Sequence, residues 1–207
     1  MRLGTVGYHA DLFGGLLCSG ALCAIAMIEG PWLGRVEWTI WLVTGVGLWT
    51  LAEYGVHRWL YHGVGFFIRL HDAHHHEPHA YIGAPPMLGV ALIFAVIYLP
   101  AVSISWLMAS GLTTGMLLGY MGYQVVHHAT HFWHPSRGSY LYRARLHHSA
   151  HHYRHKLGNF GITTAFWDQV FGTAVEVRRP GRKDHCRRSR RTRLYRYFPN
   201  LAPIPST

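Results

Sequence analysis

The chain has 207 residues, enough for one domain, and half of them are hydrophobic while only 14% are charged, where soluble domains carry roughly a quarter charged. The net charge of +10 is concentrated at the C-terminal end, because residues 177–207 contain ten Lys and Arg residues but only one Asp. Three unevenly spaced cysteines exclude a small disulfide-stapled domain. We therefore expect one apolar domain over residues 1–176 and a basic tail over 177–207 that meets anionic lipid headgroups, with no nucleic acid partner.

Uncharged runs in the first sixty residues predict two membrane-spanning helices. Crossing the hydrocarbon core takes about 20 apolar residues, and residues 12–28 form an uncharged run that we interpret as a first span. A cleavable signal peptide with Arg2 as its basic region is the alternative for this run. Residues 39–50 are apolar and rich in tryptophan, and the helical pattern continues to His62. We therefore expect a second span that leaves the bilayer carrying histidines.

The longest uncharged stretch predicts two further spans. Residues 78–136 contain no Asp, Glu, Lys or Arg. Within this stretch Pro85-Pro86 is expected to open a third helix, Ser110-Gly111 to turn the chain, and residues 112–123 to begin a fourth helix. Pro100 is expected to kink the third helix. Two buried helices of a soluble protein are the alternative, but so short a chain cannot cover this much apolar surface.

The basic residues orient a four-span chain. In that arrangement 18 of the 19 Lys and Arg share a side with both termini and the loop over residues 57–86, and only Arg35 lies opposite. Lys and Arg tend to stay cytoplasmic. We therefore expect an integral, multi-pass membrane protein whose termini and histidines face the cytoplasm.

Histidine is strongly over-represented, with 18 copies, of which 16 lie within residues 57–155. Successive residues of an α-helix are about 100° apart, so His127 and His131, four apart, share a face and can hold one ion. His57 and His62, five apart, are about 140° apart and would serve two ions. Single histidines near span ends are ordinary polar or pH-sensitive groups, but spaced clusters predict a metal site.

Two other clusters repeat one spacing. In the first, His71 and His74 share a face and His75 points about 100° away from His74, so two can chelate one metal while the third reaches another. Imidazole suits iron, zinc, copper and nickel, so the spacing leaves the metal open. The clusters together offer ten candidate ligands, five for each of two metals: His57, His62, His71, His74, His75, His127, His131, His148, His151 and His152.

These histidines belong to motifs that follow one another from Glu53 to Thr173. The motifs are Glu53-Tyr-Gly-Val-His57-Arg-Trp-Leu-Tyr-His62, His71-x-x-His74-His75, Pro85-Pro86, His127-x-x-x-His131, His148-x-x-His151-His152 and Phe166-Trp-Asp-Gln-Val-Phe-Gly-Thr173. In this combination the chain resembles the fatty acid hydroxylase and sterol desaturase superfamily of membrane di-iron oxygenases, and within it the fatty acid 2-hydroxylase branch.

The resemblance implies a fold and an activity. The fold is an all-α integral membrane protein with four transmembrane helices and a cytoplasmic helical cap that holds the dinuclear site. The activity is hydroxylation of a lipid, a fatty acyl or sphingolipid chain, with O2, two electrons and two Fe ions, for which Zn is a possible substitute. No catalytic residue is expected beyond the metal ligands. By the family's pattern one metal is held by His57, His71, His74, His148 and His151, and the other by His62, His75, His127, His131 and His152.

Several points stay open. Eukaryotic members often carry a fused cytochrome b5 domain, whereas about ten residues precede the first span here, so a separate cytochrome b5-like or ferredoxin-like electron donor is expected. Glu53 is expected to accept the ring N–H of His57 or to be an ordinary interfacial carboxylate. Asp168 is likewise expected either to orient a ligand through a hydrogen bond or to cap the local structure. Additional histidines adjoin the expected ligands and leave the register open by one residue: His76, His128, His147 and His155.

Other functions fit parts of the pattern. A sterol-type desaturase or a carotenoid hydroxylase of the same superfamily is the nearest alternative. A histidine-rich metal transporter or sensor is an alternative from another class, but it should show ionisable residues within several spans. A bis-histidine haem protein would place single histidines on facing spans.

Overall fold

Long helices make up most of the described chain. The computed structural model describes residues 1–29, 32–153 and 158–175, so the basic tail, Cys186 and His155 lie outside the described residues. Within those ranges the regular elements are helical, and an isolated bridge joins Arg2 to Ile82. The expected all-α class is therefore confirmed. The elements are α1 (Thr5–Glu29), α2 (Trp32–Gly55), the π-helix η1 (Val56–Tyr61), α3 (Gly65–His76), α4 (Leu88–Ile93), the π-helix η2 (Phe94–Tyr98), α5 (Leu99–Val102), α6 (Trp106–Phe132), α7 (Tyr140–Tyr153) and α8 (Phe166–Val170).

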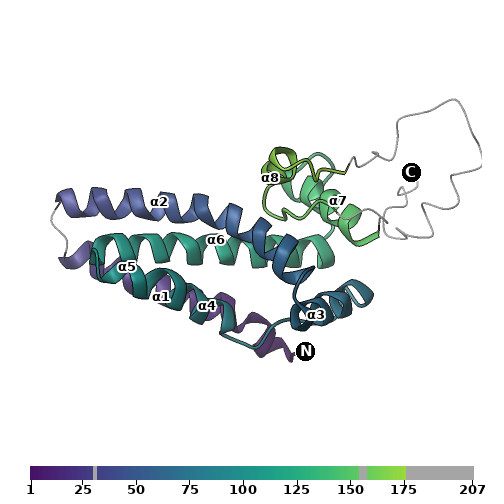
Figure 1. Cartoon of the computed structure of the whole chain (residues 1–207), viewed down its shortest axis with the longest axis horizontal. Helices are drawn as coiled ribbons and strands as arrows, with labels where there is room; N and C mark the ends of the chain where they lie inside the picture. The colour runs from purple at the N-terminus through teal and green to yellow at the C-terminus, as the bar shows by residue number, and fades with distance from the viewer. Residues whose placement is uncertain (30–31, 154–157, 176–207) are drawn as a thin grey trace, which may run out of the picture.

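The long helices run along one axis and the short ones gather at one end. Helices α1, α2 and α6 and the segment from α4 to α5 extend along the length of the molecule (Figure 1). Helices α3, α7 and α8 lie at the end that also holds the N-terminus. We call α3, α7, α8 and the loop over residues 158–165 the cap.

Small residues let α2 and α6 approach closely. A Cβ atom added to Gly115 of α6 would lie 2.8 Å from Val46 N and 2.9 Å from Gly45 Cα of α2. Gly111 of α6 is equally close to α2, since an added Cβ would lie 2.6 Å from Trp38 O. Such contacts of backbone with backbone are typical of helices that pack within membranes.

The expected turn at Ser110-Gly111 is wrong. Both residues are buried inside α6, which begins one turn earlier, where the side chain of Ser105 accepts a hydrogen bond from Met108 N at 3.3 Å. Ser110 is compatible with the helix because its hydroxyl donates to Trp106 O at 2.7 Å. Gly111 serves close packing against α2 rather than a turn.

The third expected helix is irregular next to its proline. The segment begins at Leu88, after Pro85-Pro86 and the N-cap residue Met87, and passes through the π-helix η2 before α5. Pro100 lies in the first turn of α5. Proline has no N–H and its ring crowds the carbonyl four residues back, so a wider π-helical turn before it relieves the conflict.

A carboxylate of α1 holds the start of α4. Asp11 accepts hydrogen bonds from Met87 N, from Gly89 N at 3.3 Å and from the Tyr120 hydroxyl at 2.5 Å. Met87 has φ = 65°, a left-handed conformation that turns the chain into α4. Asp11 therefore ties three helices together at one point.

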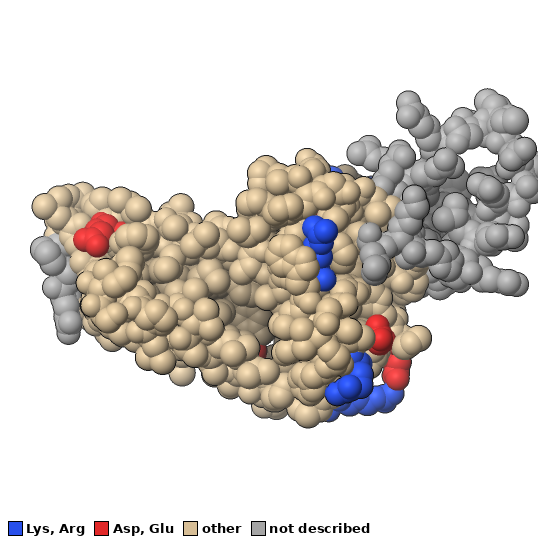
Figure 2. All heavy atoms as spheres, viewed as in Figure 1, with Lys and Arg blue, Asp and Glu red and all other residues tan. Residues whose placement is uncertain are grey.

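Charge and hydropathy agree with a membrane protein. Among the described helices α1 is long and apolar enough to cross a bilayer, over Thr5–Ile28. On the face shown in Figure 2 the charged side chains lie toward the two ends, and the bundle between them is uncharged apart from an acidic group inside a hollow. The number of spans stays a prediction.

Candidate metal centre

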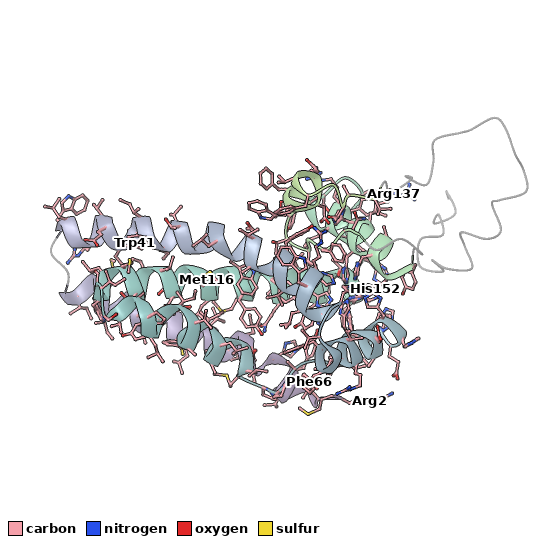
Figure 3. All side chains as sticks on the ribbon, in the orientation of Figure 1. Arg2, Trp41, Phe66, Met116, Arg137 and His152 are labelled. Carbon is pink, nitrogen blue, oxygen red and sulfur yellow. The ribbon has the colours of Figure 1, made fainter. Side chains whose placement is uncertain are left out.

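Imidazole rings from four segments converge where the cap meets the long helices. Figure 3 shows nitrogen-bearing side chains crowded around His152, and the histidines concerned come from η1 and its C-cap, α3, α6 and α7. Nine histidines form two groups, and within each group the potential ligand nitrogens lie within 4.8 Å of one another. Group A consists of His57, His62, His71 and His151, and group B of His74, His127, His131, His148 and His152.

The nitrogens of group A face one common point. His57 Nε2 lies 3.1 Å from His71 Nε2 and 3.0 Å from His151 Nε2. His75 extends the group, since its Nε2 lies 2.9 Å from His71 Nε2 and 3.1 Å from His151 Nε2. Nitrogens bound at 2.0–2.1 Å to one ion are roughly 3 Å apart when they are adjacent in an octahedral arrangement. The spacing in group A therefore suits a metal ion.

Group B has the same spacing. His127 Nε2 lies 3.1 Å from His74 Nε2 and 3.2 Å from His131 Nε2. His148 Nε2 lies 2.9 Å from His131 Nε2 and 3.0 Å from His152 Nε2. With His75 counted in group A, each group offers five nitrogens, so all ten histidines singled out in the sequence are brought together.

The two ligand sets that the resemblance implies are wrong in this structure, because the ten histidines are divided differently between the two groups. His74 and His148 lie in group B, while His62 and His75 lie with group A. On α3 the residues that share a group are four apart, His71 and His75. Residues four apart differ by only about 40° in direction, whereas residues three apart differ by about 60° in the opposite sense.

The π-helix η1 explains a second correction. His57 and His62 were expected to serve two ions, but both belong to group A, and their rings stack with centroids 5.5 Å apart. A π-helix joins residue i to residue i+5, so two side chains five apart point the same way. The widened turn over Val56–Tyr61, with His62 as its C-cap, thus brings two potential ligands to one ion.

The neighbouring histidines have other partners. His128 stacks on Phe132 with centroids 4.4 Å apart, and His147 Nε2 lies 3.1 Å from Asp168 Oδ2. His76 is exposed at the end of α3. In the pair His127-His128 the group B member is therefore His127, and in the pair His147-His148 it is His148. His128 and His147 lie outside both groups.

Backbone carbonyls orient two rings of group A. His57 Nδ1 lies 2.6 Å from Phe160 O, and His151 Nδ1 lies 2.9 Å from Gly158 O. Because a carbonyl only accepts, each Nδ1 carries the proton and leaves Nε2 free to bind a metal. No motif in the sequence indicates this contribution, since it comes from the backbone of a loop without a histidine.

Glu53 does not contact His57, so the expected hydrogen bond between them is wrong. Glu53 Oε1 accepts from Ile162 N at 2.6 Å and from Thr163 N at 2.8 Å, and Oε2 accepts from Thr163 Oγ1 at 2.7 Å. It therefore supports the loop whose carbonyls orient the rings.

Asp168 supports the same loop from the other side. Its carboxylate accepts from Phe160 N and Gly161 N, both at 2.8 Å, and from Thr173 Oγ1 at 2.7 Å. Burial raises the pKa of Asp168, but the hydrogen bonds from His147, Thr173 and the two backbone amides outweigh it and lower that pKa below its usual value. The carboxylate is thus ionised at neutral pH.

Burial keeps the cap histidines neutral. It lowers the pKa of His74 and of His75 to about 4, and the pKa of His151 to about 3, with the nearby imidazoles as a further cause. A neutral imidazole has a lone pair for a metal ion, whereas an imidazolium has none. The rings are therefore in their metal-binding state at pH 7.

A cavity of about 370 Å³ leads to both groups. It is bounded by α1, α6 and residues 82–86, and Figure 2 shows the surface hollowed between the long helices and the cap. Its polar lining comes from Asp11, Tyr61, Tyr120, Tyr123 and Gln124. From groups A and B it reaches His57, His71, His74, His127 and His148.

Comparisons with known proteins agree with this geometry. The model of the fatty acid hydroxylase family matches residues 42–173. Fatty acid 2-hydroxylase of Macaca fascicularis is 37% identical over 145 residues, which are 63% of this chain and 38% of that protein. Dihydroceramide fatty acyl 2-hydroxylase FAH2 of Arabidopsis thaliana is 29% identical over 157 residues, 67% of this chain and 62% of that protein.

A solved structure has a similar fold. The structure of full-length scs7p, of which only the hydroxylase domain is visible, matches with a TM-score of 0.70 and 26% identity. The match covers 86% of this chain and 70% of the other. The described helices thus have a counterpart in an experimentally determined structure.

Proposed function

Because the chain belongs to the fatty acid hydroxylase family, we propose that it is a membrane-bound dimetal oxygenase that hydroxylates the acyl chain of a lipid. The relatives named above act on fatty acids and on dihydroceramide fatty acyl groups and oxidise carbon 2, so carbon 2 is the proposed position. The observation that carries the proposal is the pair of five-nitrogen groups at the inner end of one cavity.

The residues present fit two metal ions. Group A with His75 would hold one ion and group B the other. Imidazole suits iron, and zinc as a substitute. When bound, two iron ions would supply the redox chemistry that activates O2 with two electrons and puts one oxygen atom into a C–H bond. The electrons would come from a separate donor, cytochrome b5-like or ferredoxin-like.

The chain itself binds and positions the lipid. The cavity borders both α1 and α6, so an acyl chain can enter it from the bilayer side. Gln124 Oε1 is buried there with no hydrogen-bond partner among the described residues, and the Tyr61 and Tyr123 side chains line the same wall. These polar groups would hold the polar end of the lipid, which places the adjoining carbon near the histidines.

Four spans with a cytoplasmic cap are part of the proposal. Helices α2 and α6 have 24 and 27 residues, and at 1.5 Å per residue both exceed the roughly 30 Å of hydrocarbon. Exposed apolar residues along α2, among them Leu33, Ile40 and Val43, suit contact with lipid. The excess of Lys and Arg on the cap side supports a cytoplasmic cap.

The test is lipid analysis in a host that lacks 2-hydroxylated lipids. Cells that make the chain should contain acyl lipids heavier by one oxygen, located by fragmentation at carbon 2, and cells with the empty vector should not. A new double bond without added oxygen would favour a sterol-type desaturase. Unchanged lipids in cells that accumulate the protein together with an electron donor would contradict the proposal.

A further inference from the structure

One loop contacts group A through its backbone. We call residues 158–164 the ligand loop. Gly158 O and Phe160 O accept from the Nδ1 atoms of His151 and His57, at 2.9 and 2.6 Å. Both rings belong to group A, and Phe160 also packs edge-on against them, with ring centroids 5.7 Å from each. The orientation of these rings therefore depends on where the loop lies.

Two buried carboxylates hold that loop from opposite sides. Glu53, on α2, is 3% exposed and accepts three hydrogen bonds from Ile162 and Thr163. Asp168, on α8, is fully buried and accepts from the backbone amides of Phe160 and Gly161. The donors of these bonds belong to residues 160–163, which overlap and directly follow the two carbonyls that face group A. A shift of the loop would thus move both rings at once.

Group B lacks such an anchor at two of its rings. The Nδ1 atoms of His148 and His152 are buried and have no hydrogen-bond partner among the described residues. Outer hydrogen bonds fix the tautomer and direction of a ligating imidazole and raise its affinity for the metal. Two rings of group A therefore have a backbone anchor that two rings of group B lack.

From this asymmetry we propose that Glu53 and Asp168 are positioning residues for one metal only. They act through the ligand loop on His57 and His151, so they set the affinity of group A for its ion and leave group B largely unaffected. The inference rests on the proposed dimetal function and adds that the two metal sites are not equivalent.

The test counts metal ions in purified, detergent-solubilised protein. Glu53→Leu removes all three acceptor contacts and should reduce the metal content from two ions per chain to one. Loss of a ligand's outer partner lowers metal affinity roughly 10- to 100-fold, so a competing chelator should remove one ion faster and leave the other at the wild-type rate. Asp168→Asn, which replaces one acceptor oxygen by a donor, should also speed the release of the group A ion, but it alters the contact with His147 as well, so Glu53→Leu is the selective variant.

Two variants serve as controls. Glu53→Gln keeps the oxygen that accepts from Ile162 N and Thr163 N, so it should restore the second ion. Glu37→Leu removes a carboxylate from the same helix at an exposed position and should leave both ions in place. A merely structural role for Glu53 would not predict loss of one ion with retention of the other.

The outcomes separate this inference from the proposed function. Two ions with wild-type chelator resistance in Glu53→Leu would overturn the inference, and so would equal loss of both ions. If Glu53→Leu does not accumulate, Thr163→Val removes one hydroxyl donor and should still speed the release of a single ion, and unchanged release would overturn the inference. Fewer than two ions in the wild-type protein would instead contradict the dimetal proposal itself.

Discussion

At the scale of the residue, each metal-facing imidazole needs a neutral ring and a fixed direction. Burial in the cap supplies the first, because it lowers the pKa of His74 and His75 to about 4. Backbone carbonyls supply the second at His57 and His151. Spacing along the helix then decides which group a ring joins. These three factors predict distinct effects for neighbouring histidines.

Replacing His131 should separate ligands from bystanders. His131→Ala removes one nitrogen of group B, and we expect hydroxylation to fall by more than about 100-fold, since the loss of even an outer partner costs 10- to 100-fold. His76→Ala changes an exposed ring outside both groups and should keep nearly full activity. Both are measured as hydroxylated lipid per mole of protein in the membrane. Similar activity in the two variants would contradict the assignment of His131.

Removing the metals should make stability depend on pH. In metal-free protein the pKa of His74 lies near 4 and that of His151 near 3, below the usual 6.5. Between those values the unfolded chain binds protons that the folded chain does not, so stability falls as the pH drops below 6.5. Each ring contributes roughly 1 kcal/mol per pH unit. The midpoint of thermal unfolding should therefore fall from pH 7 to pH 5, and a flat profile would contradict burial of neutral rings.

Some residue contacts follow from the sequence and others do not. His127 and His131 were expected to share one ion because they are four apart on an α-helix, and the structure places them together. The pairing of His57 with His62 depends on a π-helix, which an α-helical period cannot reveal. The role of the ligand loop could not be predicted from the sequence either, because every residue has a backbone carbonyl and no side-chain pattern marks the ones that bind a ring.

At the scale of the element, glycines decide how closely α2 and α6 pack. Gly115→Ala puts a Cβ 2.8 Å from Val46 N and 2.9 Å from Gly45 Cα, so the helices must move apart at a cost of about 1–3 kcal/mol. We expect a lower unfolding temperature in detergent, by roughly 2–4 °C per kcal/mol. Gly122→Ala, on the same helix with no atom within 4 Å of the added Cβ, should be neutral or slightly stabilising. Equal effects in both would argue against close packing at Gly115.

Helix positions were easier to predict than helix boundaries. Uncharged runs located α1 and α2, and the π-helical segment before Pro100 agrees with the expected irregularity there. The dipeptide Ser110-Gly111 was misleading, because small residues mark a turn in water but mark close contact between helices in a membrane. The role of a small residue depends on whether water or another helix surrounds it, and the local sequence does not determine this.

At the scale of the whole molecule, the excess of basic residues on the cap side predicts a cytoplasmic cap and tail. In intact cells a thiol reagent that cannot cross membranes should fail to label Cys186 in a variant with Cys18→Ser and Cys23→Ser. A second variant without native cysteines but with Glu37→Cys, at the opposite end of α2, should be labelled. The reverse pattern would invert the topology.

The number of metal ions bound by the wild-type chain distinguishes a dinuclear centre from every alternative. Group A with His75 and group B each present five imidazole nitrogens at the spacing of a coordination shell. Elemental analysis of folded, detergent-purified protein, with protein quantified by amino-acid analysis, should give two ions per chain, whether iron or substituted zinc. One ion or none in folded protein supplied with metal would contradict the dinuclear centre and the oxygenase function that depends on it.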